Sequence, residues 1–232
     1  LSFLISLFNI FFIYNLFSRI EFIKKEHSED IGLAIVILIS SIILLTTTNN
    51  LDLSEVLIAV ISSISNSGIA LDEIESNFSL YLLFLTIIGG SLVSNTSGIK
   101  LLRIYILLKA SSNEILKLVR PNNVTNQYIF FSDKKINNEN IKLSFLIFIS
   151  FFLSIFILSG ILLVDDINFE NSFKLSILTL TNTVNSNNYI DQYIDFGNLL
   201  TSSKISLIIF MVIGKIELIS FFLIMKKMFF KN

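Results

Sequence analysis

Five apolar stretches, each close to the length needed to cross a bilayer as a helix, alternate with polar segments along the chain. They span residues 1–17, 31–46, 80–108, 143–164 and 205–230. A membrane-spanning helix needs about 20 mainly apolar residues. Two shorter apolar stretches, residues 56–64 and 173–180, are about half that length. We therefore predict five membrane crossings and two half-helices that enter the membrane and return to the same side.

The third apolar stretch is interrupted by glycines and small polar residues. The interruption lies between residues 88 and 103 and contains Gly89, Gly90, Ser94, Thr96 and Gly98. An unwound backbone in hydrocarbon leaves its N–H and C=O groups unpaired at a cost of several kcal/mol each. Such a break persists only where protein buries it or where it lines a water-filled path, which favours a role in transport. The alternative is close helix packing through small residues.

Polar residues at the start of each short apolar stretch are suited to helix capping. Asp52, Ser54 and Glu55 precede the first stretch, and Asn171 and Ser172 precede the second. Side-chain oxygens can accept hydrogen bonds from the first backbone N–H groups of a helix, and acidic residues are favourable there. We expect Asp52, Ser54 and Glu55 to lie in the first turn of one half-helix, and Asn171 and Ser172 to cap the other.

A short polar loop follows each half-helix. Its carbonyl groups can turn toward a pore axis and replace the water shell of a potassium ion, which needs a residue that tolerates positive φ. Gly68 suits that position in the first loop and Asn185 in the second. The predicted ion-binding residues are Ser65, Asn66, Ser67, Gly68, Thr183, Val184 and Asn185. For each loop, an ordinary turn between helices is the alternative.

Composition and charge agree with an integral membrane protein. Hydrophobic residues make up 53% of the chain, which includes 23 Phe. Cysteine is absent, which excludes disulfides and thiolate chemistry, and a net charge of −1 gives no indication of nucleic-acid binding. Basic residues cluster after the first apolar stretch, in the long central connection and at the C-terminus, whereas acidic residues dominate the other connections. By the positive-inside rule, the basic segments and the C-terminus face the cytoplasm.

The order of long helix, half-helix and long helix occurs twice. The two units cover residues 31–109 and 142–232, residues 110–141 form a cytoplasmic connection, and residues 1–30 form an inner helix and loop that precede the first unit. Repeats in membrane transporters usually surround a shared pathway. The predicted fold class is all-α integral membrane.

Several motifs in order resemble the Trk/Ktr/HKT superfamily of potassium transporters, and most closely its bacterial TrkH-type membrane subunit. Residues 62–68 resemble a filter segment, residues 89–100 an intramembrane gating loop, residues 118–124 a cytoplasmic stretch, and residues 214–217 a motif of the last inner helix. The resemblance implies half of a four-repeat, pseudo-tetrameric cation pore, consisting of the end of repeat two and all of repeats three and four.

The resemblance also implies partners, and the chain departs from the family pattern at named residues. The implied partners are the N-terminal half of the transporter, a cytoplasmic TrkA-like nucleotide-binding regulatory subunit and a second copy of the protein. Asn185, Ser186 and Asn187 stand where the family usually has Gly-Pro-Gly, Lys215 replaces the usual Arg, and Leu92 and Val93 replace smaller residues. Lysine keeps the positive charge near the pore axis but lacks the planar donor fork of arginine.

Other charged residues admit structural interpretations. Lys215 and Glu217 lie inside an apolar helix, where a pore function and a structural Lys to Glu or Lys to carbonyl contact are both open. We expect Lys100 and Arg103 to reach the cytoplasmic interface as anchors. His27, surrounded by charged residues, is expected to be a solvated loop residue.

The sequence favours potassium uptake across the inner (plasma) membrane, with no cofactor besides the transported ion. A membrane enzyme would need a nucleophile, base or metal cluster, and the scattered carboxylates and single His do not form one in the sequence. The other hypothesis is a truncated, degenerate transporter fragment without independent transport activity.

Overall fold

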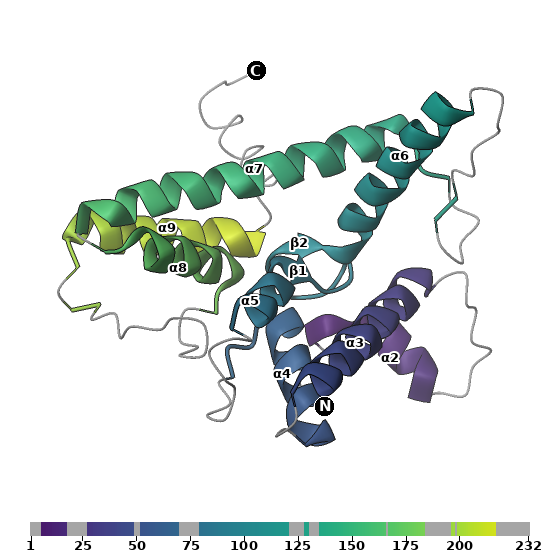
Figure 1. The fold of residues 1–232 in the computed structure, drawn as a ribbon, viewed down its shortest axis with the longest axis horizontal. Helices are drawn as coiled ribbons and strands as arrows, with labels where there is room; N and C mark the ends of the chain where they lie inside the picture. The colour runs from purple at the N-terminus through teal and green to yellow at the C-terminus, as the bar shows by residue number, and fades with distance from the viewer. Residues whose placement is uncertain are drawn as a thin grey trace.

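A computed structural model describes residues 6–17, 27–48, 52–69, 79–120, 128–129, 135–165, 167–183, 196–197 and 199–216. The described chain is almost entirely helical (Figure 1). Its elements are α2 (Ile10–Phe17), α3 (Ser28–Thr47), α4 (Leu53–Ser65), α5 (Ser79–Ile87), β1 (Ile88–Gly89), β2 (Ile99–Lys100), α6 (Leu101–Val119), α7 (Asn138–Leu162), the 3-10 helix η2 (Leu163–Asp165), α8 (Phe169–Thr181) and α9 (Thr201–Ile216).

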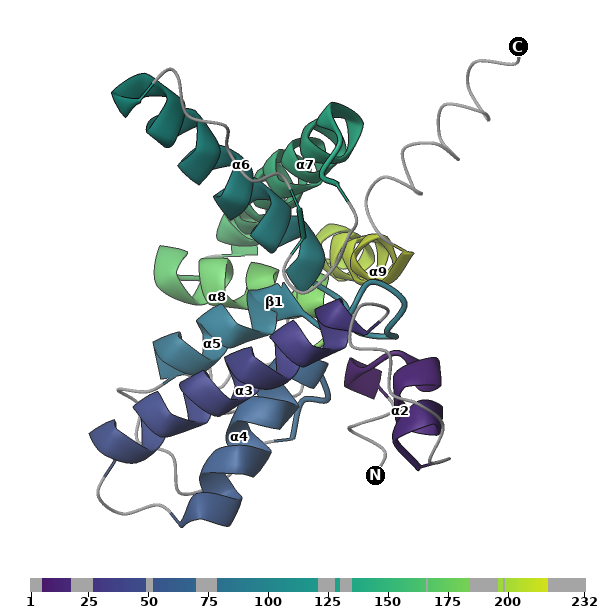
Figure 2. The same cartoon turned by 90° about the vertical axis from the view of Figure 1, so that its right-hand side faces the viewer.

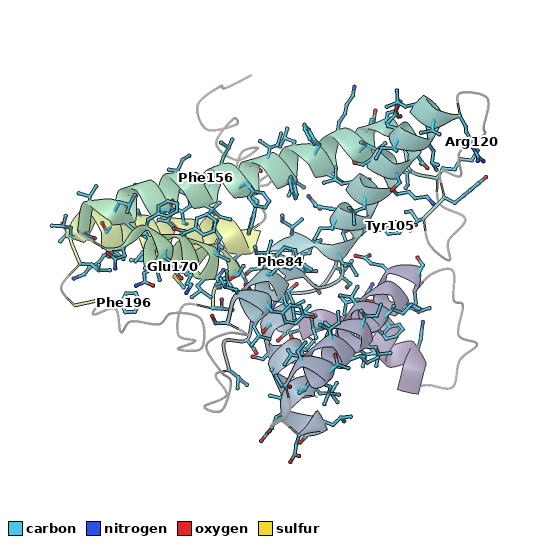
Figure 3. The ribbon with its side chains drawn as sticks, viewed as in Figure 1. Phe84, Tyr105, Arg120, Phe156, Glu170 and Phe196 are labelled. Carbon is cyan, nitrogen blue, oxygen red and sulfur yellow. The ribbon has the colours of Figure 1, made fainter. Side chains whose placement is uncertain are left out.

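Among the described residues, two helices are long and apolar enough to cross a membrane. One is α3 with 20 residues, and the other is the 28-residue segment formed by α7 and η2. Large apolar side chains stay exposed along both helices, as Phe156 on α7 illustrates (Figure 3). Exposed apolar side chains on such a helix are suited to contact with lipid.

The predicted repeat is present as two three-helix arrangements. The half-helix α4 packs between α3 and α5, and the half-helix α8 packs between α7 and α9. Both half-helices have 13 residues, which gives a length of about 20 Å against a hydrocarbon core of about 30 Å. Figure 2 shows α5 lying between the α3–α4 pair and the α8–α9 pair, and α5 contacts both α4 and α8. The two units therefore meet along α5.

The half-helices begin earlier than the apolar pattern predicts, because their first turns are polar. Asp52 caps α4 and forms a capping box with Glu55, whose Oε2 accepts a hydrogen bond from the Asp52 N–H at 3.0 Å. The prediction that Asn171 and Ser172 cap the second half-helix is wrong, because Asn168 occupies the cap position. Asn171 and Ser172 are instead buried in the first turn of α8.

The predicted break in the third apolar stretch is confirmed. Helix α5 ends at Ile87, and β1 and β2 form a short parallel pair in which Ile88 is paired with Ile99 and Gly89 with Lys100. The backbone then returns to helix at Leu101. Helix α6 continues to Val119, about three turns beyond the boundary expected at residue 109, because its last part keeps helix-forming Leu, Lys and Glu residues.

The buried core joins the two units. It includes Val56, Val60 and Ile64 from α4, together with Leu82 and Leu85 from α5 and Ile177, Leu178 and Leu180 from α8. Within the second unit, the backbones of α8 and α9 approach each other closely at one point. A Cβ atom added to Gly214 on α9 would overlap the Leu180 carbonyl oxygen at the end of α8.

Gly214→Ala is expected to lower the free energy of unfolding by about 1–3 kcal/mol, because α9 must move away from α8. Gly160→Ala on α7 is the matched control, since nothing lies within 4 Å of its added Cβ and alanine favours the helix. Thermal unfolding of the detergent-solubilised protein measures both. A Gly214→Ala midpoint at or above that of the Gly160→Ala protein would contradict the packing.

Candidate functional site

The two half-helices end in the same backbone motif. Asn66 after α4 and Asn182 after α8 adopt left-handed conformations, with φ values of 54° and 60°. In each case the next residue closes the motif, since Ser67 N donates to Ser62 O at 3.2 Å and Thr183 N donates to Leu178 O at 2.8 Å. The sequence pattern predicted positive φ at Gly68 and Asn185 but not at these two asparagines. The sequence does contain a signal for the left-handed conformation, because an Asn directly follows each half-helix and Asn adopts this conformation more readily than most residues.

The ends of the half-helices lie next to each other. A Cβ atom on Gly68 would be 3.9 Å from Thr183 Cα, the nearest heavy atom. The positive φ predicted for Gly68 is confirmed at 70°. Thr183 is buried, and its Oγ1 lies 2.9 Å from Thr181 Oγ1 in a hydrogen bond. The two polar loops therefore meet where the sequence placed the ion-binding residues.

Most of the predicted ion-binding residues belong to this meeting point. Ser65 is the last residue of α4, and Asn66, Ser67 and Gly68 follow it directly, while Thr183 lies on the other loop. Val184 and Asn185 lie outside the described residues. The role of all of them as potassium ligands stays a prediction.

The segment between β1 and β2, residues 90–98, satisfies many of its polar groups internally. We name it the gating loop, after the resemblance noted above. Gly90 N donates to Thr96 Oγ1 at 2.7 Å, Ser94 Oγ donates to Ser91 O at 2.6 Å, and the Ser94 and Thr96 hydroxyls lie 2.9 Å apart. Hydroxyl groups thus replace helical partners for the backbone, as a break inside a membrane protein requires.

The glycines of this region allow close approach of backbone to backbone. A Cβ on Gly89 would lie 2.5 Å from Ser97 O, and one on Gly98 would lie 2.8 Å from Ile87 O. Gly98 also has a φ of 79°, which glycine adopts at low cost. These contacts are made within the broken helix itself, so the alternative of small residues that let one helix pack on another does not describe Gly89 and Gly98.

Lys100 on β2 directs its side chain into the gating loop, and the expectation of an interface anchor is wrong. Its side chain is 4% exposed. The ammonium group donates to Ser94 O at 2.8 Å and Thr96 O at 2.7 Å, with both hydroxyls at 3.2 Å. Lys100 points into the loop because carbonyl groups there need a strong donor. Arg103 is also buried, so it too is not an exposed anchor.

Lys215 reaches the same loop from the other repeat. Its ammonium group donates to Asn95 O at 2.8 Å. The carbonyls of three consecutive residues, Ser94, Asn95 and Thr96, are therefore bonded to lysine ammonium groups from two different helices. Of the two contacts left open for Lys215, the structure has the one to a carbonyl. Glu217 lies outside the described residues.

The N-terminal segment and the start of α3 also bond the gating loop. Ser91 N donates to Leu7 O at 3.0 Å, and Leu92 N donates to Glu29 Oε1. His27 is buried, not solvated as expected, and lies 2.9 Å from Asn15 Nδ2 in a hydrogen bond. Burial of His27 follows from its packing against Phe12 and Asp30.

Comparison with known proteins identifies the class of fold. No model of a known protein family matches this sequence. A curated relative, the uncharacterised cation transporter MJ1485 of Methanocaldococcus jannaschii, is 25% identical over 206 residues, covering 82% of this chain and 40% of that protein. The crystal structure of the potassium transporter TrkH from Vibrio parahaemolyticus matches with a TM-score of 0.76 and 19% identity, covering 98% of this chain and 51% of the other.

The fold is therefore that of an all-helical membrane transporter. More specifically, it is the TrkH fold, and the chain spans about half the length of the proteins it matches. The resemblance to the Trk/Ktr/HKT superfamily that the motifs suggested is confirmed at the level of the fold, as is the predicted fold class.

Lys100→Met is expected to lower the free energy of unfolding by about 1–3 kcal/mol, because the Ser94 and Thr96 carbonyls lose a buried donor. Lys117→Met on α6, the helix that directly follows Lys100, is the control. Lys117 is exposed and pairs with Glu114 at 2.6 Å, and such a surface pair contributes about 1 kcal/mol at most. Equal thermal unfolding midpoints for the two variants would show that Lys100 does not hold the loop.

Proposed function

We propose that the chain takes up potassium ions across the cell membrane as the pore-forming C-terminal half of a Trk-type transporter. The observation that carries this proposal is the meeting of two half-helix ends beside the gating loop. Gly68 and Thr183 lie next to each other there, and Asn66 and Asn182 both donate to Ser97 in the loop. A half-helix pair and a broken helix at one point are features of an ion path through a membrane.

Helix electrostatics favour a cation at this point. Each helix carries about half a negative charge at its C-terminal end, where the last carbonyls have no partner within the helix. In α4 and α8 these ends converge, while the opposite ends carry acidic residues such as Glu55 and Glu170. Two converging C-termini attract a positive ion and repel an anion.

Potassium is favoured over other cations by the expected ligands and by the relatives. In this proposal the backbone carbonyls of Asn66, Ser67, Thr183 and Val184 bind the dehydrated ion, together with those of the two repeats supplied by the N-terminal half. Neutral carbonyl ligands suit a large monovalent cation. The TrkH structure with the same fold is described as a potassium transporter, and MJ1485 as a cation transporter.

The gating loop is proposed to block the path on the cytoplasmic side of the filter. Lys100 and Lys215 hold it in the arrangement seen here through carbonyls of three consecutive residues. In this proposal a cytoplasmic TrkA-like nucleotide-binding subunit moves the inner helices and withdraws Lys215 from the Asn95 carbonyl. The protein would act as a homodimer in the inner membrane, with a cytoplasmic C-terminus.

Growth of a bacterium that lacks its own potassium uptake systems tests the function. The chain is expressed alone and together with the N-terminal half of a TrkH-type subunit, at low external potassium. Growth rescue by at least one format is expected. It should be lost in Gly68→Val, because a β-branched residue is strongly disfavoured at positive φ.

Gly32→Val is the matched control, because nothing lies within 4 Å of a Cβ added at Gly32 on α3. Rescue should persist in that variant. Membrane-inserted protein that fails to rescue in both formats would contradict the proposal and favour a fragment without transport. Equal rescue by Gly68→Val and the wild type would exclude this loop as the ion path.

A further inference from the structure

The polar loops that follow α4 and α8, with the predicted ion-binding residues 65–68 and 183–185, are called the filter loops. We propose that Ser97 is a positioning residue that joins both filter loops to the gating loop. The position of the gating loop would then set the ion selectivity of the filter that these loops form. The effect on ion selectivity rests on the proposed function. The contacts themselves join three segments that are distant in sequence and meet at one serine.

Ser97 accepts hydrogen bonds from the asparagines at both half-helix ends. Asn66 Nδ2 donates to the Ser97 carbonyl oxygen at 3.0 Å, and Asn182 Nδ2 donates to the Ser97 hydroxyl at 3.0 Å. The partners are 31 and 85 residues away from Ser97. Ser97 is 2% exposed, and polar groups buried to that degree need their partners. One residue of the gating loop therefore contacts the equivalent position of each repeat.

The two asparagines have two separable properties. Each holds a left-handed backbone that ends its half-helix, and each supplies an amide that donates to Ser97. Glycine satisfies the first requirement without strain but offers no side-chain donor. The occurrence of Asn at both positions, where Gly would serve the backbone, is explained by the contact with Ser97.

Movement of the gating loop cannot leave these contacts unchanged. Ser97 follows Thr96, whose carbonyl is bonded to Lys100, and precedes Gly98, which has backbone atoms of Thr86 and Ile87 close to its Cβ position. A rearrangement that frees the loop displaces Ser97 and removes a hydrogen bond from both filter loops at once. By linkage, an ion bound in the filter must in turn stabilise the blocked position of the loop.

A further bond extends this tie to the last inner helix. Asn182 Nδ2 also donates to Met211 O on α9 at 3.1 Å. Lys215 lies one turn further along α9 and bonds the gating loop through Asn95 O. Helix α9 thus contacts both the filter end of α8 and the gating loop, which gives movement of α9 a route to both.

The contacts are chemically different, and this makes the proposal testable. Ser97→Ala removes the hydroxyl that accepts from Asn182 but keeps the carbonyl that accepts from Asn66. Asn182→Gly and Asn66→Gly remove one amide each and keep the left-handed backbone. Ser112→Ala is the control, because Ser112 is exposed and its Oγ donates to Leu108 O within its own helix.

Two readouts are measured on the detergent-solubilised protein in the format that supports growth: the thermal unfolding midpoint, and the ratio of rubidium to sodium affinity, taken from the rise of that midpoint with the concentration of each ion. Ser97→Ala combined with Asn182→Gly should match Asn182→Gly alone in both. Ser97→Ala combined with Asn66→Gly should show the sum of the two single effects. Ser97→Ala should lower the ratio of rubidium to sodium affinity in the blocked state by about threefold to tenfold, the effect of one buried hydrogen bond, while Ser112→Ala leaves it unchanged.

The outcomes separate this inference from the proposed function. Additive unfolding effects for Ser97→Ala and Asn182→Gly would overturn the tie itself. Non-additive unfolding with an unchanged ratio of rubidium to sodium affinity would overturn its role in selectivity. If the wild type takes up no rubidium in any format, the proposed function fails and the selectivity role fails with it, whereas the unfolding comparison still decides whether Ser97 joins the two half-helix ends.

Discussion

A backbone that leaves the helical conformation inside a membrane must find partners for its N–H and C=O groups within the protein. In this chain the segment from β1 to β2 is under that constraint, and much of the neighbouring structure serves it. Serine and threonine hydroxyls bond the loop from within. Leu7 and Glu29 accept hydrogen bonds from the backbone N–H groups of Ser91 and Leu92. Lysines from two helices bond the carbonyls of three consecutive residues.

The two lysines are not equivalent. Lys100 lies at the N-terminus of α6, where the helix dipole disfavours a positive charge, so the surrounding loop oxygens must stabilise its ammonium group. It belongs to the same segment as the loop and moves with it. Lys215 lies in the last described turn of α9, where a positive charge is favourable, and it bonds the loop through Asn95 O. Lys100 therefore stabilises the loop from within its own segment, whereas in the proposed function Lys215 releases the loop when α9 moves.

The hydrophobic pattern predicted α3, the two half-helices, the broken third helix and α7. In the first apolar stretch it predicted one continuous crossing, whereas the helix is interrupted at residues 8–9 and α2 begins at Ile10. Long and half-length apolar stretches alternate in the sequence as the helices do in the structure, and the glycines near residue 90 marked the break. These features depend on whether a segment contacts lipid or water, and the hydrophobicity of each segment indicates which of the two it contacts. The position of Gly68 was also predictable, because positive φ restricts the choice of residue.

The positions of individual polar side chains were not predictable in the same way. Lys100, Arg103 and His27 were expected at exposed positions because charged residues usually lie there, yet tertiary contacts bury them. The caps of α8 were misplaced because several polar residues precede the apolar stretch and each can serve as a cap. The bonds from Asn66 and Asn182 to Ser97 join residues far apart in sequence, so no local pattern contains them.

In the proposed function, the two half-helix ends form part of a potassium path beside the gating loop. Crystals of the protein in the assembly that supports transport, grown with rubidium in place of potassium, test it most directly. We predict an anomalous rubidium peak bounded by the backbone oxygens of residues 66–68 and 183, which disappears when sodium replaces rubidium. Rubidium peaks only elsewhere in the protein, or a peak at this position that sodium does not change, would contradict the account.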